Sequence, residues 1–217
     1  MNSVTFGSFI SGRLGGLYET LSPLQFWALH AAIVGAGGVL MLLIGLMIRL
    51  DSKGPAIFRQ HRTGFRAQVI TVYKFRTMRY EDHASADEDK RLDLAITREA
   101  DSRITRVGKF LRKTRLDELP QLFNVLKLEM SLVGPRPEVV PLTMWYEREI
   151  PFYHYRHIIK PGITGWAQVN QGHVAGVDDI KMKLQYDFYY IRNFSIWLDI
   201  LIVMKTIKTM LTGYGHK

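Results

Sequence analysis

The sequence predicts an α+β fold: a mostly helical body with little sheet, preceded by an N-terminal helix embedded in a membrane. Three observations lead to this prediction. An uncharged apolar run covers residues 24–48. One short stretch, residues 69–73, has the β-branched and aromatic composition of a strand. From residue 102 onward, most of the chain shows helical patterns separated by proline and glycine.

The apolar run divides the chain into residues 1–49 and residues 50–217. A straight helix over 24–48, rising about 1.5 Å per residue, could cross the hydrocarbon core of a bilayer. The cluster of Gly35, Gly37 and Gly38 instead favours a bent helix that re-enters on the side from which it came. A buried helix of a soluble protein is the simpler alternative.

Charge is distributed unevenly along the chain. The formal net charge is +9, and before Arg49 the only charged side chains are Arg13 and Glu19. Under the positive-inside rule, the basic body after the apolar run is cytoplasmic. Such a body favours phosphate-bearing partners such as nucleotides or anionic lipids, although general solubility would also explain it. The absence of cysteine excludes disulfides and thiolate metal sites.

Two helices are expected between residues 102 and 130. Ser102 could cap a first helix that ends near Lys113, and Pro120 fits the opening turn of a second helix that ends near Met130. This places Asp117 and Glu118 at the start of the second helix. Residues 79–101 are expected to form a loop with some helix, and residues 161–172 a loop. Residues 195–211 are expected to form an amphipathic helix, which could lie at a membrane interface or dock as the C-terminal helix of a soluble fold.

The sequence LRKTRLDELP at residues 111–120 is the strongest candidate for chemistry. Arg112 and two further cations precede Asp117 and Glu118. Adjacent carboxylates can bind Mg²⁺, and a carboxylate can also attack phosphorus and form a covalent intermediate. A structural reading is equally available, because acidic residues are favoured at the start of any helix.

Further candidates for phosphate binding are Arg136, held between two prolines, and Lys74 and Arg76, which follow the predicted strand. Each could instead be an ordinary surface cation. The histidines show no metal-ligand spacing, and no P-loop, GxGxxG or GxSxG pattern is present. No recognised nucleic-acid module is present either.

Five segments between Leu50 and Ile207 together resemble the bacterial sugar transferase family, the monotopic phosphoglycosyl transferases. They read LDSKGPAIFRQHRTG, YKFRTM, DSRITRVGKFLRKTRLDELPQLFNVLKLEMSLVGPRPE, KPGITGWAQVN and DFYYIRNFSIWLDILIVMKTI. The stretch from LRKTRLDELP to GPRPE is the most specific of these.

The resemblance implies phosphoglycosyl transfer at the cytoplasmic face of a bacterial inner membrane. In this family an aspartate attacks the β-phosphate of a UDP-sugar, UMP leaves, and polyprenyl phosphate accepts the sugar phosphate. By resemblance, Asp117 is the nucleophile and binds Mg²⁺ together with Glu118, while Arg112 and Arg136 bind substrate phosphates. No nucleic acid is expected beyond the nucleotide sugar.

The sequence departs from the family pattern in three places. The Ser-Pro break usual in the re-entrant helix is absent, as is the basic and aromatic leader before it, and Gln171-Gly172 stand where Gly-Arg is common. Two other functions are open: a membrane-bound glycosyltransferase that releases UDP, and a non-enzymatic basic scaffold anchored to the membrane. The product, UMP or UDP, separates the first of these from phosphoglycosyl transfer.

Overall fold

The computed structural model describes residues 23–79, 101–171 and 176–212, and describes side chains from residue 35 to residue 210 within those ranges. The chain divides into two compact units, residues 1–46 and residues 47–217. In the described residues, helices predominate and the strands form two small two-stranded sheets, which confirms the α+β class. The loop predicted at residues 79–101 lies almost entirely outside the described residues.

Helix α2 (Pro23–Asp51) contains the whole apolar run and continues through its glycine cluster. The bend predicted at Gly35–Gly38 is therefore wrong for this structure. The physical reason is that no proline follows Pro23 within the helix, so no backbone N–H is missing from the hydrogen-bond ladder. Glycine alone lowers helix stability by only about 1 kcal/mol per residue. None of the helices in the described part of the chain combines the length and apolar character needed to cross a membrane.

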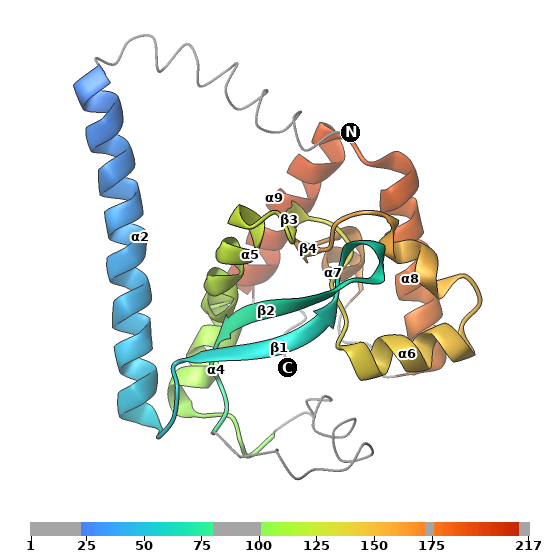
Figure 1. Ribbon diagram of the computed structural model, residues 1–217, viewed down its shortest axis with the longest axis horizontal. Coiled ribbons are helices and arrows are strands. Elements are labelled where there is room, and N and C mark those ends of the chain that lie inside the picture. The colour runs from blue at the N-terminus through green and yellow to red at the C-terminus, as the bar shows by residue number, and fades with distance from the viewer. Residues whose placement is uncertain (1–22, 80–100, 172–175, 213–217) are drawn as a thin grey trace. The chain divides into compact units, whose positions relative to one another are not determined.

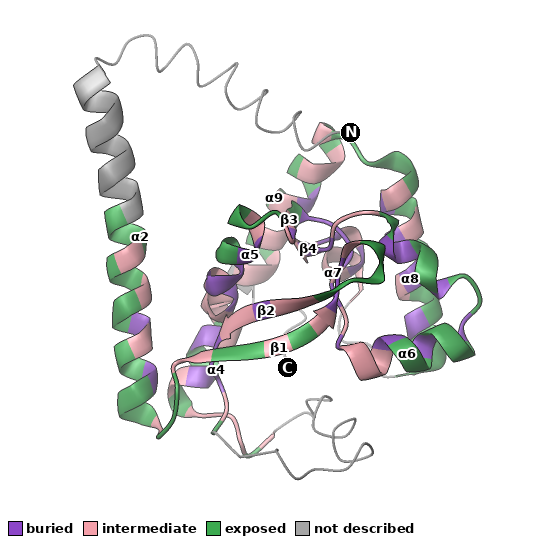
Figure 2. Ribbon diagram, in the orientation of Figure 1, coloured by how far each residue is buried: buried purple, intermediate pink, exposed green. Residues whose placement is uncertain are grey.

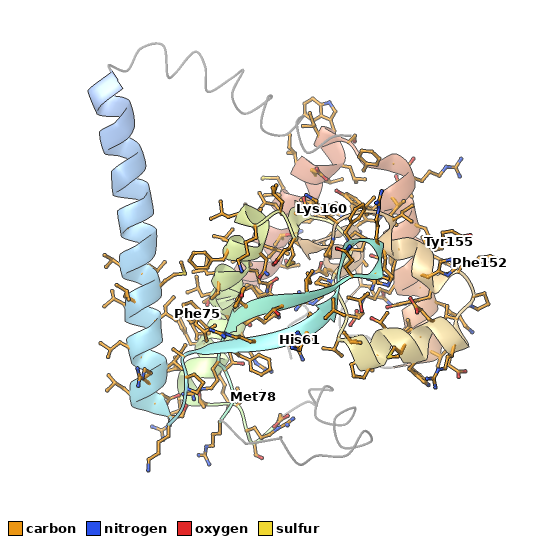
Figure 3. The ribbon with its side chains drawn as sticks, viewed as in Figure 1. His61, Phe75, Met78, Phe152, Tyr155 and Lys160 are labelled. Carbon is orange, nitrogen blue, oxygen red and sulfur yellow. The ribbon has the colours of Figure 1, made fainter. Side chains whose placement is uncertain are left out.

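Within the second unit, a β-hairpin follows the end of α2 in the sequence (Figure 1). Strand β1 (Ile57–Thr63) pairs antiparallel with β2 (Val69–Phe75), with Ile57 opposite Phe75 and Thr63 opposite Val69. The strand predicted at residues 69–73 is confirmed and extends to Phe75. After Phe75 the chain passes Met78, and both residues are labelled in Figure 3. Met78 forms an isolated bridge with Ile104.

Helix α4 (Arg106–Thr114) begins later than predicted. The capping residue is Thr105, whose hydroxyl accepts a hydrogen bond from the N–H of Gly108 at 3.0 Å. Ser102 cannot cap this helix, because the chain between it and Thr105 is taken up by the bridge at Ile104. The helix ends at Thr114, and the capping residue after it, Arg115, adopts a left-handed conformation with φ 58°.

The second predicted helix is a 3₁₀ segment, η2 (Leu116–Gln121), followed directly by α5 (Leu122–Leu126). Together, η2 and α5 begin before Pro120, which lies inside η2. They end before Met130, because Leu128 adopts a positive φ of 60°. The predicted position of Asp117 and Glu118 is confirmed, since both lie in the first turn of η2.

A second small sheet joins β3 (Ser131–Val133) and β4 (Gly162–Thr164) in parallel. The chain between them forms α6 (Val140–Glu149) and η3 (Tyr153–Ile158). Phe152 and Tyr155 lie next to one another on the outer side of η3 (Figure 3). The loop predicted at residues 161–172 is wrong, because that stretch contains β4 and helix α7 (Trp166–Asn170).

Glycine makes this sheet possible. The N–H of Gly134 donates to the carbonyl of Thr164 at 2.9 Å, and the N–H of Gly162 donates to the carbonyl of Pro135 at 3.0 Å. A Cβ atom on Gly162 would overlap the backbone nitrogen of Gly134, and one on Gly165 would overlap the carbonyl oxygen of Gly134. The glycines in this stretch, which predict a loop, are instead required because two backbone segments come close together there.

Helices α8 (Val177–Asn193) and α9 (Ile196–Thr212) complete the body, so the helix predicted at residues 195–211 is confirmed. One side of α9 packs into a core with Val133 and Tyr190 through Ile202, which is fully buried. Exposed residues alternate with less exposed ones along α9 (Figure 2). Its other side carries exposed apolar side chains: Trp197, Ile200, Leu201, Met204 and Ile207.

We expect Gly162→Ala to destabilise the protein by about 2–3 kcal/mol or more, because the added methyl group has no space between two backbone segments. Gly176→Ala is the matched control, since its nearest atom would be a carboxylate oxygen at 3.9 Å. Thermal unfolding of the purified proteins measures both. Equal melting temperatures for the two variants would contradict the close approach of β3 and β4.

Candidate active site

Three segments that are distant in sequence bring four of the predicted site residues together. Lys74 comes from β2, Asp117 and Glu118 from η2, and Arg136 from the turn between β3 and α6. Glu118 is buried, and its Oε1 atom accepts from Lys74 Nζ at 3.2 Å and from Arg136 Nη2 at 2.8 Å. The cluster is therefore centred on one carboxylate oxygen that two cations contact.

Asn124 in α5 explains why η2 lies against β2. Its fully buried amide accepts a hydrogen bond from the N–H of Tyr73 at 3.2 Å and donates to the carbonyl of Thr71 at 2.7 Å. The amide also donates to Glu129 at 2.7 Å. Because Tyr73 precedes Lys74, these bonds fix the strand where it presents Lys74 to Glu118.

The surroundings of the two carboxyl groups shift their pKa values in opposite directions. Burial raises the pKa of Glu118, but the charges of Arg136 and Lys74 outweigh it and hold that pKa well below its usual range. For Asp117, burial and the neighbouring charge of Glu118 together raise the pKa above its ordinary value. Burial and the charge of Arg136 lower the pKa of Lys74 to about 8.

Asp117 also has an unsatisfied oxygen. Its Oδ1 atom is buried and has no hydrogen-bond partner, whereas Glu118 Oε1 has two. A buried carboxylate oxygen without a partner is costly, so its presence beside several cations marks a place for an incoming group. Such an oxygen is suited to attack an electrophile or to bind a metal ion.

The residues present fit Mg²⁺ only if a substrate shares the ion. Among the described residues there is no group of three or more His, Asp and Glu side chains that could hold a metal. Two carboxylates with substrate phosphates and water are, however, the usual environment of protein-bound Mg²⁺. The unpartnered Oδ1 of Asp117 is the atom available for this role.

Of the two remaining predicted site residues, Arg112 lies near the cluster and Arg76 does not. Arg112 Nε donates to Thr77 Oγ1 at 2.9 Å, and burial lowers its pKa while the charge of Asp117 raises it, so it lies near the cluster. Arg76 is not brought into the cluster. Its buried guanidinium donates to the carbonyls of Ser52 and Lys53, both at 2.7 Å, directly after α2, and to the carbonyl of Ile48 in the last turn of α2 at 3.4 Å.

Sequence reasoning missed the residues that support the site. These are Asn124, described above, and a fully buried ion pair in which Arg156 of η3 donates to Asp187 of α8 at 2.7 Å. One signal was available: Asp187 continues the spacing of Ile180 and Leu184 along the buried side of a helix. A carboxylate within such a stripe indicates a buried cation partner.

A family model described as bacterial sugar transferase matches residues 25–213 of the chain. The chain belongs to the bacterial sugar transferase family. The site residues Lys74, Asp117, Glu118 and Arg136 all lie within the matched region.

Curated relatives of the chain carry names that specify sugar phosphates. The UDP-N-acetylgalactosamine-undecaprenyl-phosphate N-acetylgalactosaminephosphotransferase of Aeromonas hydrophila is 52% identical over 180 residues, which are 82% of this chain and 40% of that protein. The UDP-glucose:undecaprenyl-phosphate glucose-1-phosphate transferases of Xanthomonas campestris pv. campestris and Escherichia coli (strain K12) are 45% and 39% identical. The alignments cover 77% and 95% of this chain and 34% and 44% of those proteins. The chain thus spans less than half the length of these relatives.

The opposite pKa shifts predict opposite effects of two equivalent substitutions on stability at pH 7. Asp117→Asn removes a charge that folding disfavours, so the melting temperature should stay unchanged or rise. Glu118→Gln leaves Lys74 and Arg136 facing each other, and it should cost about 1.5–3 kcal/mol. Thermal unfolding measures both, with Asp178→Asn on the exposed side of α8 as the control.

The same reasoning fixes the pH dependence. The raised pKa of Asp117 means that its carboxyl opposes folding only when ionised, so any gain from Asp117→Asn should disappear as the pH falls through that pKa. The contribution of ionised Glu118 to folding stability is fully present above the ordinary pKa of a glutamate. It is lost only as the pH falls below that value toward the lowered pKa of the folded state. Equal losses of stability in both variants at pH 7 would contradict the assignment.

Proposed function

We propose that this protein transfers a sugar-1-phosphate from a UDP-sugar to polyprenyl phosphate, with Asp117 as the nucleophile and UMP as the first product. The observation that carries the proposal is the buried, unpartnered Oδ1 of Asp117 beside a carboxylate held by Lys74 and Arg136. The names of the relatives, which specify UDP-sugars and undecaprenyl phosphate, support the same reaction class.

The chemistry proceeds in two displacements at phosphorus. An oxygen of Asp117 attacks the β-phosphorus of the UDP-sugar, the bond from that phosphorus to the bridging oxygen breaks, and UMP leaves with the electron pair. A phosphate oxygen of the polyprenyl phosphate then attacks the same phosphorus. The aspartyl–phosphorus bond breaks, which restores the carboxylate and yields the polyprenyl diphosphosugar.

The side chains around Asp117 have distinct tasks in this proposal. Arg136 and Lys74 stabilise negative charge on the transferred phosphate, and Arg112 contributes from the side of α4. Glu118 keeps both cations in place through its ion pairs. Mg²⁺, held by Asp117 and Glu118 with the diphosphate, would neutralise charge on the leaving nucleotide.

We further propose that the protein is attached to the bacterial inner membrane with this site on the cytoplasmic face. Residues 24–48 carry no charged side chain, and α2 exposes large apolar residues along its described part, among them Leu42, Leu43 and Leu46. The exposed side of α9 is also apolar, and Trp197 on it is 78% exposed. Cations are concentrated after the apolar run, which favours a cytoplasmic body.

A single-turnover experiment tests the covalent step. With UDP-N-acetylgalactosamine or UDP-glucose and Mg²⁺, but no lipid acceptor, the enzyme should release UMP up to about one equivalent. Asp117→Asn should release none, because the amide lacks the attacking charge. Mass spectrometry of the quenched protein should place the added mass on the peptide that contains Asp117.

The product also distinguishes the alternatives. Release of UDP rather than UMP would indicate a glycosyltransferase that moves the sugar alone, and no release from any UDP-sugar would favour the scaffold. UMP release that depends strictly on the lipid acceptor, with Asp117→Asn still active, would refute a covalent aspartyl intermediate.

Membrane contact through α9 can be measured separately. In vesicles that contain lipids with brominated acyl chains, tryptophan fluorescence should be quenched, and Trp197→Phe should remove part of that quenching. Trp145→Phe serves as the control, because Trp145 is also exposed but lies on α6. If both substitutions have the same effect on quenching, α9 does not lie in the interface.

A further inference from the structure

The turn that carries Arg136 is held by its carbonyl oxygens. Four consecutive carbonyls, those of residues 135–138, each accept a hydrogen bond from another segment. The donors, in order, are the N–H of Gly162 at 3.0 Å, Arg156 Nη2 at 2.9 Å, Arg62 Nη1 at 2.6 Å and the N–H of Thr63 at 2.9 Å. Two of the four donors are therefore guanidinium groups.

The prolines explain why carbonyls serve as the points of attachment. Pro135 and Pro137 have no backbone N–H, so these two residues cannot donate to a neighbouring segment. They restrict the shape of the turn, but they do not fix its position relative to η2. That position depends on donors that reach the carbonyls from outside.

Each of the two arginines is itself held in place. Arg156 is 2% exposed, and its Nε and Nη2 atoms donate to Asp187 Oδ2 at 3.0 and 2.7 Å. Its Nη1 atom donates to the hydroxyl of Tyr153 at 3.0 Å. Arg62 on β1 donates from Nε and Nη2 to Gln60 Oε1 at 3.0 and 2.8 Å. The bonds to the turn are thus made by oriented groups, which lose little entropy in making them.

We propose that Arg62 and Arg156 are positioning residues for the transfer reaction: they hold the backbone of residues 136 and 137 so that the Arg136 guanidinium stays on Glu118 and beside Asp117. This inference rests on the proposed function for its kinetic consequence. Reactions that depend on positioned charges lose rate when the charged group shifts by as little as 1 Å.

Arg156→Lys and Arg62→Lys test the proposal. Lysine keeps the positive charge, but its single ammonium group lacks the planar set of donors of a guanidinium. It therefore cannot bond at once to the side chain that orients it, Asp187 or Gln60, and to a carbonyl of the turn. Each substitution should lower kcat/KM for the UDP-sugar about 10- to 100-fold, mainly through kcat. The matched controls are Arg148→Lys on α6 and Arg59→Lys on β1, both exposed, and neither should change the rate more than about 2-fold.

A double-mutant cycle separates positioning from general destabilisation. If Arg62 and Arg156 act through Arg136, their substitutions should change kcat/KM by less than about 2-fold in an Arg136→Ala background. Fully multiplicative losses would overturn the proposal, because they would show an effect independent of Arg136. Arg62→Lys serves if Arg156→Lys, at the more buried position, fails to fold.

The same cycle in thermal unfolding does not require activity. Arg136→Ala should lower the melting temperature less in the Arg156→Lys or Arg62→Lys background than in the wild type, because the bond from Arg136 to Glu118 is already weakened there. Equal decreases in all backgrounds would overturn the inference. If the wild type shows no transferase activity but the changes in melting temperature are non-additive, the proposed function is refuted. The inference that Arg62 and Arg156 position Arg136 then still holds.

Discussion

The buried carboxylate of Glu118 is the interaction on which the arrangement of the site depends. A carboxylate removed from water is strongly unfavourable unless cations and hydrogen bonds replace the water. Here the two cations come from β2 and from the turn after β3, so the ionised carboxylate of Glu118 can be buried without a large penalty only when the hairpin, η2 and the turn are assembled around it. Asp117, the adjacent residue, is partly buried, and its Oδ1 atom has no such pairing. The structure therefore concentrates the stabilising contacts on one carboxylate and leaves Oδ1 of the other without a hydrogen-bond partner.

A second set of contacts, between side chains and the backbone, surrounds this pair. Asn124 fixes η2 against β2 through backbone groups, and Arg62 and Arg156 fix the turn through its carbonyls. In each case a side chain bonds to main-chain atoms, which stay in place when neighbouring side chains change.

The sequence predicted the local features of this protein better than its long-range pairings. The strand at residues 69–73 and the position of Asp117 and Glu118 at the start of a helical turn depend on composition and proline within a few residues, and both are observed. Strand β1 was missed because Arg59, His61 and Arg62 interrupt its apolar residues. The roles of Arg76 and Arg156 depend on which carbonyls and carboxylates the fold places opposite them, and no local pattern encodes that information.

The bonds of Asn124 have a consequence for β2 as an edge strand. In a two-stranded hairpin each strand has one free edge, whose unpaired N–H and C=O groups can recruit a strand from another molecule. The amide of Asn124 occupies two such groups of β2, the N–H of Tyr73 and the carbonyl of Thr71, much as a neighbouring strand would. The segment that presents Asp117 and Glu118 thus also shields the hairpin, so a molecule that loses the geometry of its site exposes an aggregation-prone edge at the same time.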